Sequence, residues 1–145
     1  MANKNLIINS EEHSLEFKAI GLILCIAQEI NSKMNRVLKP LGLSSTQAAI
    51  LHCLSDSPNG ELTVNQIRKL MIEDNPNVSR SLNKLQSNKF VVKRRSKDDQ
   101  RVVFIKITKT GKALIKEAEI LLAPILRINA SGKESEALFN ILKKI

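Results

Sequence analysis

Two short segments near the middle of a chain otherwise patterned for helices place the strongest limit on the fold. Residues 90–95 and 102–107 are rich in β-branched side chains, and a polar stretch of six residues separates them. Two such runs predict an antiparallel β-hairpin with a charged tip. Alternation along the second run places Val103, Ile105 and Ile107 on one face.

Capping boxes mark the starts of two helices ahead of the hairpin. Ser44 and Thr63 each precede a glutamine by three residues, Gln47 and Gln66. In this motif the hydroxyl oxygen accepts a hydrogen bond from the backbone N–H of the glutamine. The side-chain oxygen of the glutamine accepts one from the backbone N–H of the capping residue. We therefore expect one helix that ends near residue 55 and a short second helix that ends near Ile72.

A third helix follows at Asn75 and Pro76, which have the residue types of an N-cap and a first helical position. Val78, Leu82 and Leu85 share its inner face, and the opposite face is polar and basic. Two short helices joined by a tight connection, the second polar outside, are typical of a helix-turn-helix. With the hairpin as its wing, this predicts a winged helix-turn-helix.

Positive charge is concentrated in this region. Residues 61–112 hold 13 Lys/Arg and 5 Asp/Glu, a net charge of +8 of the chain's +9. A localised basic surface suits the DNA phosphate backbone, whose contacts supply most non-specific binding free energy. The alternative is a solvated surface that only aids solubility.

The helices expected at both ends carry apolar faces without a partner inside so small a domain. One spans residues 15–38, and Pro40 and Gly42 end it. Another opens at Thr110 and is bent at Pro124, and a last amphipathic helix follows the capping serine, Ser131. Wide apolar faces of this kind predict a homodimer. The fold class is therefore mainly α with a small β-hairpin, a winged helix-turn-helix framed by N- and C-terminal dimerisation helices.

Several function classes are disfavoured. The longest apolar stretch is far shorter than a bilayer span, and no secretory signal is evident, so we expect a cytoplasmic protein without a membrane segment. Cys25 and Cys53 lie in apolar segments and are expected to be buried thiols. No metal-ligand spacing, nucleotide-binding motif or catalytic constellation is recognisable, and we expect neither a cofactor nor an enzyme.

The order of these elements resembles the MarR family of bacterial transcriptional regulators over nearly the whole chain. The most specific part is similar to the family's wing signature, here Asp99-Gln100-Arg101 followed by Ile107-Thr108-Lys109-Thr110-Gly111. The resemblance implies a DNA-binding regulator, usually a repressor relieved by a small ligand, that binds a pseudo-palindromic operator as a homodimer. Lys89 stands where the family often has glycine, so we expect Asn88 to supply the left-handed residue.

The candidate DNA-binding residues lie on the third helix and the wing. Arg101 is expected to enter the minor groove, with Asp99 holding its guanidinium. Amide and guanidinium groups on the helix match adenine and guanine edges, and other cations match phosphates. Base contacts are assigned to Asn77 and Arg80, and phosphate contacts to Ser79, Lys84, Arg94, Arg95 and Lys97.

One domain of 1–145 is expected, with a winged helix-turn-helix at 44–112 and dimerisation helices at 12–40 and 113–145. The alternative function, from a different class, is a winged-helix protein-interaction module whose basic face meets an acidic partner. A binding measurement separates the two hypotheses: a DNA-binding regulator prefers duplex DNA to acidic protein, and this preference weakens with salt.

Overall fold

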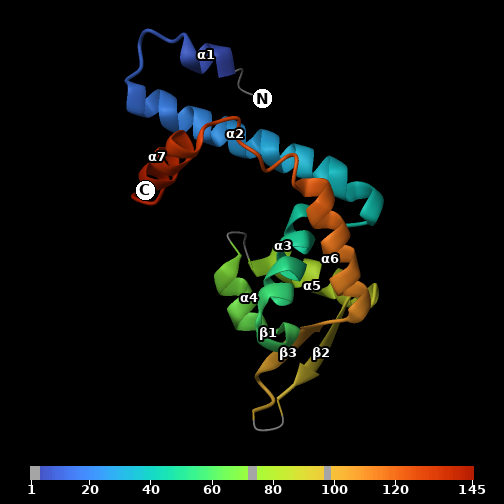
Figure 1. The fold of residues 1–145 in the computed structure, drawn as a ribbon. Helices are drawn as coiled ribbons and strands as arrows, with labels where there is room; N and C mark the ends of the chain where they lie inside the picture. The colour runs from blue at the N-terminus through green and yellow to red at the C-terminus, as the bar shows by residue number, and fades with distance from the viewer. Residues whose placement is uncertain (1–3, 72–74, 97–98) are drawn as a thin grey trace.

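A computed structural model describes residues 4–71, 75–96 and 99–145 of the chain. The helices are α1 (Lys4–Ile8), α2 (Leu15–Leu38), α3 (Ser45–Asp56), α4 (Val64–Leu70), α5 (Asn75–Ser87), α6 (Lys109–Leu122) and α7 (Gly132–Leu142). The strands are β1 (Glu61–Thr63), β2 (Val91–Arg95) and β3 (Val103–Ile107). Figure 1 shows α2 across one end of the molecule, α6 running from it into a second lobe, and the β2–β3 wing at the far end.

The predicted capping boxes are confirmed at the starts of α3 and α4. Ser44 Oγ accepts the Gln47 N–H at 3.2 Å, and Gln47 Oε1 accepts the Ser44 N–H at 3.0 Å. Thr63 and Gln66 make the same pair of bonds at 3.2 and 2.8 Å. Because these contacts are local in sequence, they start the helices independently of packing. The short helix ends at Leu70, whereas Ile72 lies outside the described residues.

The hairpin is confirmed, and a third strand that was not predicted extends it. The sheet has the order β1-β3-β2, and both pairings are antiparallel. Ile105 and Ile107 are buried and Lys106 is exposed, as the alternation predicts. β1 has only three residues, too few for a periodic pattern, and its pairing with β3 is a long-range contact.

The core lies in the lobe that holds the sheet. Among the described residues, its fully buried side chains come from five helices, α2 to α6, and from two strands, so it closes the helix-turn-helix and the hairpin into one unit. Members with no measurable exposure are Leu38, Ile50, Leu51, Leu54, Ile67, Val78, Ile105 and Ala118. Val78, Leu82 and Leu85 of α5 all face this core, as predicted.

The start of α6 differs from the prediction by two residues. Its N-cap is Thr108 rather than a residue near Thr110, and Thr108 Oγ1 accepts the Gly111 N–H at 3.0 Å. The same hydroxyl donates to the Phe90 carbonyl oxygen at 3.1 Å. This contact to Phe90, the residue just before β2, selects Thr108, and adjacency in sequence does not reveal it. α6 ends at Leu122, so Pro124 follows the helix rather than bending it.

The end of α5 also corrects the prediction. Lys89, not Asn88, adopts the left-handed conformation, with a φ of 62°. The Phe90 N–H donates to the Leu85 carbonyl at 3.0 Å, and the Lys89 N–H to that of Gln86 at 2.9 Å. These two bonds form a Schellman motif, whose geometry places the left-handed residue immediately before Phe90. The hydrogen-bond pattern, not side-chain preference, therefore selects the position.

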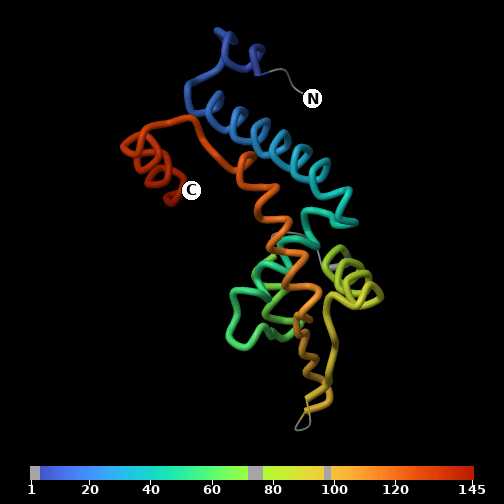
Figure 2. The backbone as a smooth tube through the Cα atoms, turned by 45° about the vertical axis from the view of Figure 1, so that its right-hand side comes forward, coloured from blue at the N-terminus to red at the C-terminus, as the bar shows by residue number. Residues whose placement is uncertain are grey.

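The terminal helices form the other end of the molecule. α2 has the predicted bounds, and the Ser131 capping box opens α7. α1 was not predicted, and it is held against α2 by a Lys4–Glu29 ion pair of 2.6 Å. In both views α7 lies apart from the lobe with the sheet (Figures 1 and 2). Among the described helices, none has the length and apolar character required to cross a membrane.

Candidate nucleic-acid interface

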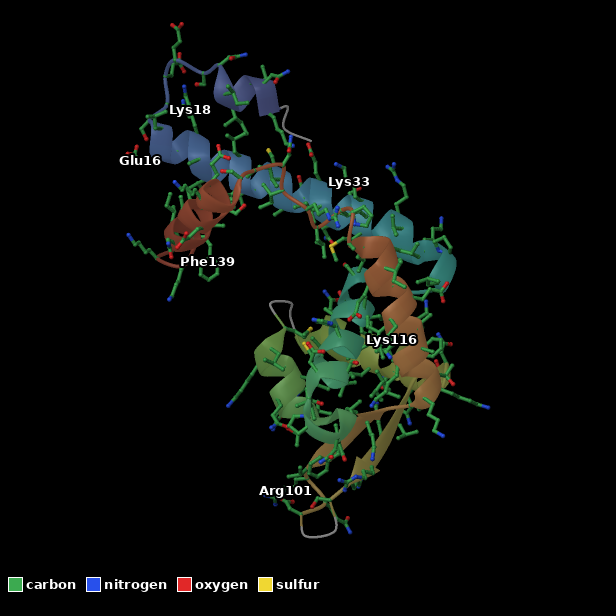
Figure 3. The ribbon with its side chains drawn as sticks, viewed as in Figure 1. Glu16, Lys18, Lys33, Arg101, Lys116 and Phe139 are labelled. Carbon is green, nitrogen blue, oxygen red and sulfur yellow. The ribbon has the colours of Figure 1, made fainter. Side chains whose placement is uncertain are left out.

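A groove of about 660 Å³ lies between α4, α5 and the wing. Among the described residues that line it, five are cationic and none is acidic. The cations are Arg68 from α4, Lys93, Arg94 and Arg95 from β2, and Arg101 from the wing tip. Figure 3 shows Arg101 at the far end of the wing, away from the body of the molecule. A concave surface of one charge sign attracts a polyanion such as a nucleic-acid backbone.

The outer face of α5 carries the polar side chains that the sequence predicts. Asn77, Arg80 and Lys84 are exposed, and Ser79 is half-buried beside the groove. The Arg80 guanidinium donates to Asn77 Oδ1 at 2.7 Å, so the two candidate base-contacting residues form one unit. α5 begins at Asn75 itself, one residue earlier than an N-cap at that position implies.

Arg94 has partners within the sheet. Its Nε lies 2.7 Å from Glu61 Oε1 on β1, and its guanidinium carbon lies 4.4 Å from the centre of the Phe104 ring on β3. The Arg94 side chain therefore reaches across β3 to the third strand. Arg95, the next residue, is exposed. The sequence grouped these two arginines as phosphate contacts, but their surroundings differ.

The wing tip is ordered by Asp99, though not in the predicted way. Asp99 Oδ1 accepts the backbone N–H of Arg101 at 2.9 Å, and the Asp99 carbonyl accepts the Val102 N–H at 3.0 Å. The carboxylate therefore shapes the turn instead of holding the Arg101 guanidinium, because an aspartate readily caps the amide two residues ahead. Lys97 lies outside the described residues.

Arg68, Asn83 and Lys93 also line the groove and were not among the predicted contacts. The Arg68 guanidinium donates to Ser79 Oγ at 3.3 Å, and Lys93 Nζ donates to Asn83 Oδ1 at 2.7 Å. A signal for Lys93 was present, since it alternates with the buried Val91 and so shares the face of β2 that meets α5. No local pattern indicates that Arg68 reaches α5.

The cysteines and His52 lie outside this groove. Both cysteines are half-buried thiols, less buried than expected, and burial followed by the nearby Asp56 carboxylate raises the pKa of Cys53. A raised pKa lowers the reactive thiolate fraction. His52 is exposed, and it bridges Glu119 of α6 at 2.8 Å and Asp56 at 3.4 Å. In the described ranges no cluster of metal-ligating side chains occurs.

Replacement of Arg94 by alanine is expected to lower the free energy of unfolding by about 1 to 2 kcal/mol. The change removes the ion pair and the ring contact, and it leaves the Glu61 carboxylate, with a side chain only 15% exposed, without its cation. Urea denaturation measures the loss. Arg95→Ala is the matched control, with an expected change within about 0.5 kcal/mol. Equal stability of the two variants would rule out a structural role for Arg94.

Comparison with known proteins places this architecture among transcriptional regulators. The family model described as transcriptional regulator SarA/Rot matches residues 32–118. An uncharacterised HTH-type transcriptional regulator, YwoH of Bacillus subtilis (strain 168), is 31% identical over 94 residues. That match covers 65% of this chain and 66% of YwoH, just under two thirds of its length. These are regulators, not enzymes.

Solved structures share the fold. A cysteine-to-serine mutant of MarR from E. coli, complexed with operator DNA, is 26% identical, with a TM-score of 0.76, and the match covers 91% of this chain and 98% of MarR. BpsR of Bordetella bronchiseptica, whose DNA binding is regulated by 6-hydroxynicotinic acid, is 20% identical, with a TM-score of 0.78 and coverage of 88% and 97%. The chain therefore belongs to the SarA/Rot family of transcriptional regulators and has the MarR-type winged helix-turn-helix fold.

Proposed function

We propose that this protein is a homodimeric, sequence-specific repressor that binds double-stranded DNA in the cytoplasm and is released by a small ligand. The observation that carries the proposal is the groove between α4, α5 and the wing, whose described lining residues include five cations and no acid. The solved structure of the E. coli MarR mutant contains operator DNA, and this supports DNA binding by the same fold in this chain. Ligand control is supported by the MarR resemblance and by the behaviour of BpsR.

In the proposed complex, α5 enters the major groove and the wing enters the adjacent minor groove. Asn77 and Arg80 then face base edges, whereas Ser79, Lys84 and Arg95 lie toward phosphates. Arg101 at the wing tip enters the minor groove, where a narrow width concentrates negative potential. We propose that Arg94 contributes to DNA binding mainly by holding the wing in shape.

A second subunit is supported by the surface that one chain leaves uncovered. The accessible area is 10785 Å², whereas a compact 16.2 kDa monomer exposes only about 7,500 Å². Large apolar side chains account for part of the excess. The most exposed of those described come from α1, α2, α6 and the C-terminus: Leu6 at 73%, Leu15 at 80%, Ile120 at 74% and Ile145 at 81%. An obligate dimer interface buries an area of this order.

The intact protein is expected to sediment as a dimer at micromolar concentration. Truncation after Ile128 removes α7 with its apolar face, and we expect this variant to dissociate to monomers. Analytical ultracentrifugation measures both, and Lys133→Ala, a change to an exposed residue of α7, serves as the control. An intact protein that remains monomeric would contradict the dimer, and with it a pseudo-palindromic site.

DNA binding is tested by titration of duplexes selected from a random library, at several salt concentrations. A dimer with about 6 to 10 phosphate contacts gives a log–log salt slope of about −5 to −9. Binding of an acidic protein in preference to every duplex would instead favour the protein-interaction module. Equal affinity for the selected duplex and its scrambled version would contradict sequence-specific recognition.

A further inference from the structure

Three side-chain oxygens of α5 each accept a hydrogen bond from a cation. Asn77 Oδ1 accepts from Arg80, and Ser79 Oγ accepts from Arg68. Asn83 Oδ1 accepts from Lys93 Nζ, the one of these three cations that comes from the wing. The face that α5 turns outward therefore offers mainly hydrogen-bond donors.

Occupation of the amide oxygen changes what Asn83 can recognise. A free asparagine offers a donor and an acceptor, and this combination matches the N6 and N7 atoms of adenine. The Lys93 ammonium takes one lone pair of that oxygen and places a positive charge beside it. This charge disfavours the approach of a second donor such as adenine N6, so the amide of Asn83 presents mainly its NH₂ group. In the major groove, guanine O6 and thymine O4 are acceptors, whereas adenine and cytosine place amino groups at the same position. An NH₂ donor thus suits the O6 or O4 oxygen of a keto base, whereas at the same position adenine and cytosine place a second donor against it.

The position of Lys93 is set by the sheet rather than by the side chain alone. Lys93 pairs with Ile105 of β3 in the register of the hairpin, and its side chain is half-buried. Its Nζ lies 2.7 Å from Asn83 Oδ1, and both residues line the groove. A half-buried lysine with one good acceptor has less rotamer freedom to lose on binding than a fully solvated one. Strand β2 of the wing thereby orients a side chain of α5.

We propose that Lys93 is a positioning residue: it engages the Asn83 oxygen, so that Asn83 contacts a base through its NH₂ group. At one position of each half-site, Asn83 then selects guanine or thymine over adenine or cytosine. This inference rests on the proposed function, because it assumes that α5 occupies the major groove. It adds a specificity determinant that spans two elements. An asparagine on this helix otherwise suggests contact with adenine, and for Asn83 the proposal is contact with guanine or thymine instead.

The test is selection of binding sites from a randomised duplex library by the wild type and three variants, followed by titration of single-base changes. For the wild type we expect one half-site position at which a keto base is favoured by about fivefold to tenfold. Asn83→Ala should lose that preference. Lys93→Met should lose it or shift it toward adenine, because the freed amide oxygen can then accept from adenine N6. Lys93→Arg, which keeps a donor, should restore it.

The salt dependence separates this role from a simple phosphate contact. Loss of a phosphate contact flattens the log–log slope by about one per subunit and weakens all sequences alike. A positioning role alters base preference and leaves the slope near that of the wild type. Unchanged base preference in both Lys93→Met and Asn83→Ala, with a flatter slope for Lys93→Met, would overturn the inference. Failure of the wild type to bind any duplex would instead overturn the proposed function.

Discussion

Replacement of Gly111 by alanine is expected to lower the free energy of unfolding by about 2 to 4 kcal/mol. Gly111 is buried in the first turn of α6, and a Cβ there would lie 2.3 Å from the carbonyl oxygen of Phe90 and 2.9 Å from Cγ1 of Ile107. The Phe90 carbonyl cannot retreat cheaply, because it accepts from the Thr108 N–H at 3.0 Å. The added methyl group therefore forces the strand and the helix apart.

Thermal or urea unfolding of the variant measures this loss, and Gly132→Ala provides a matched control. Gly132 also lies in the first turn of a helix, but a Cβ built there would meet no described heavy atom within 4 Å beyond its chain neighbours and its own helix backbone. Its replacement should be neutral or stabilising by up to about 1 kcal/mol. If Gly111→Ala were as stable as Gly132→Ala, close approach would not explain the glycine that ends the wing signature.

Replacement of Arg101 by alanine is expected to weaken binding to the operator by about 1 to 3 kcal/mol per site more than binding to scrambled duplex. The side chain is exposed at the wing tip (Figure 3), with a backbone N–H fixed by Asp99. An arginine in a narrow minor groove senses its width, which depends on sequence. Arg101→Ala should therefore lose more affinity than a variant that lacks one phosphate contact, and this larger loss should occur only with the operator.

Titration of each variant against operator and scrambled duplexes, at matched salt, measures the difference. Lys116→Ala is the control, since it removes one positive charge from an exposed site on α6 that does not line the groove. Asp99→Ala should show a milder form of the Arg101 defect, because the turn loses the cap on the Arg101 N–H. Operator affinity of Arg101→Ala equal to that of the wild type would show that the wing tip is only a solvated turn.

Elements held by local contacts were predictable. The capping boxes at Ser44, Thr63 and Ser131 each join residues three apart, and the structure contains all three. The bounds of α2 follow from its periodicity and from the turn at Pro40 and Gly42. The hairpin and its faces follow from alternation, because successive side chains of a strand point in opposite directions.

Features that depend on distant partners were not predictable. β1 exists because Glu61 to Thr63 meet β3 about forty residues later, and so short a segment has no pattern of its own. Thr108 is selected as the cap of α6 by its contact with Phe90, and Lys89 takes the left-handed conformation in the Schellman motif. α1 depends on α2, through the Lys4–Glu29 ion pair.

The candidate site divides in the same way. Its location, charge and element order were determined by the sequence, because the basic residues cluster in one third of the chain and the helix and wing patterns are local. Only the tertiary structure decided which cations meet which acceptors: Arg94 with Glu61 across the sheet, and Lys93 with Asn83 between wing and helix. The physical reason is that an ion pair or hydrogen bond acts over a few ångströms, and residues far apart in sequence reach that distance only when the chain is folded.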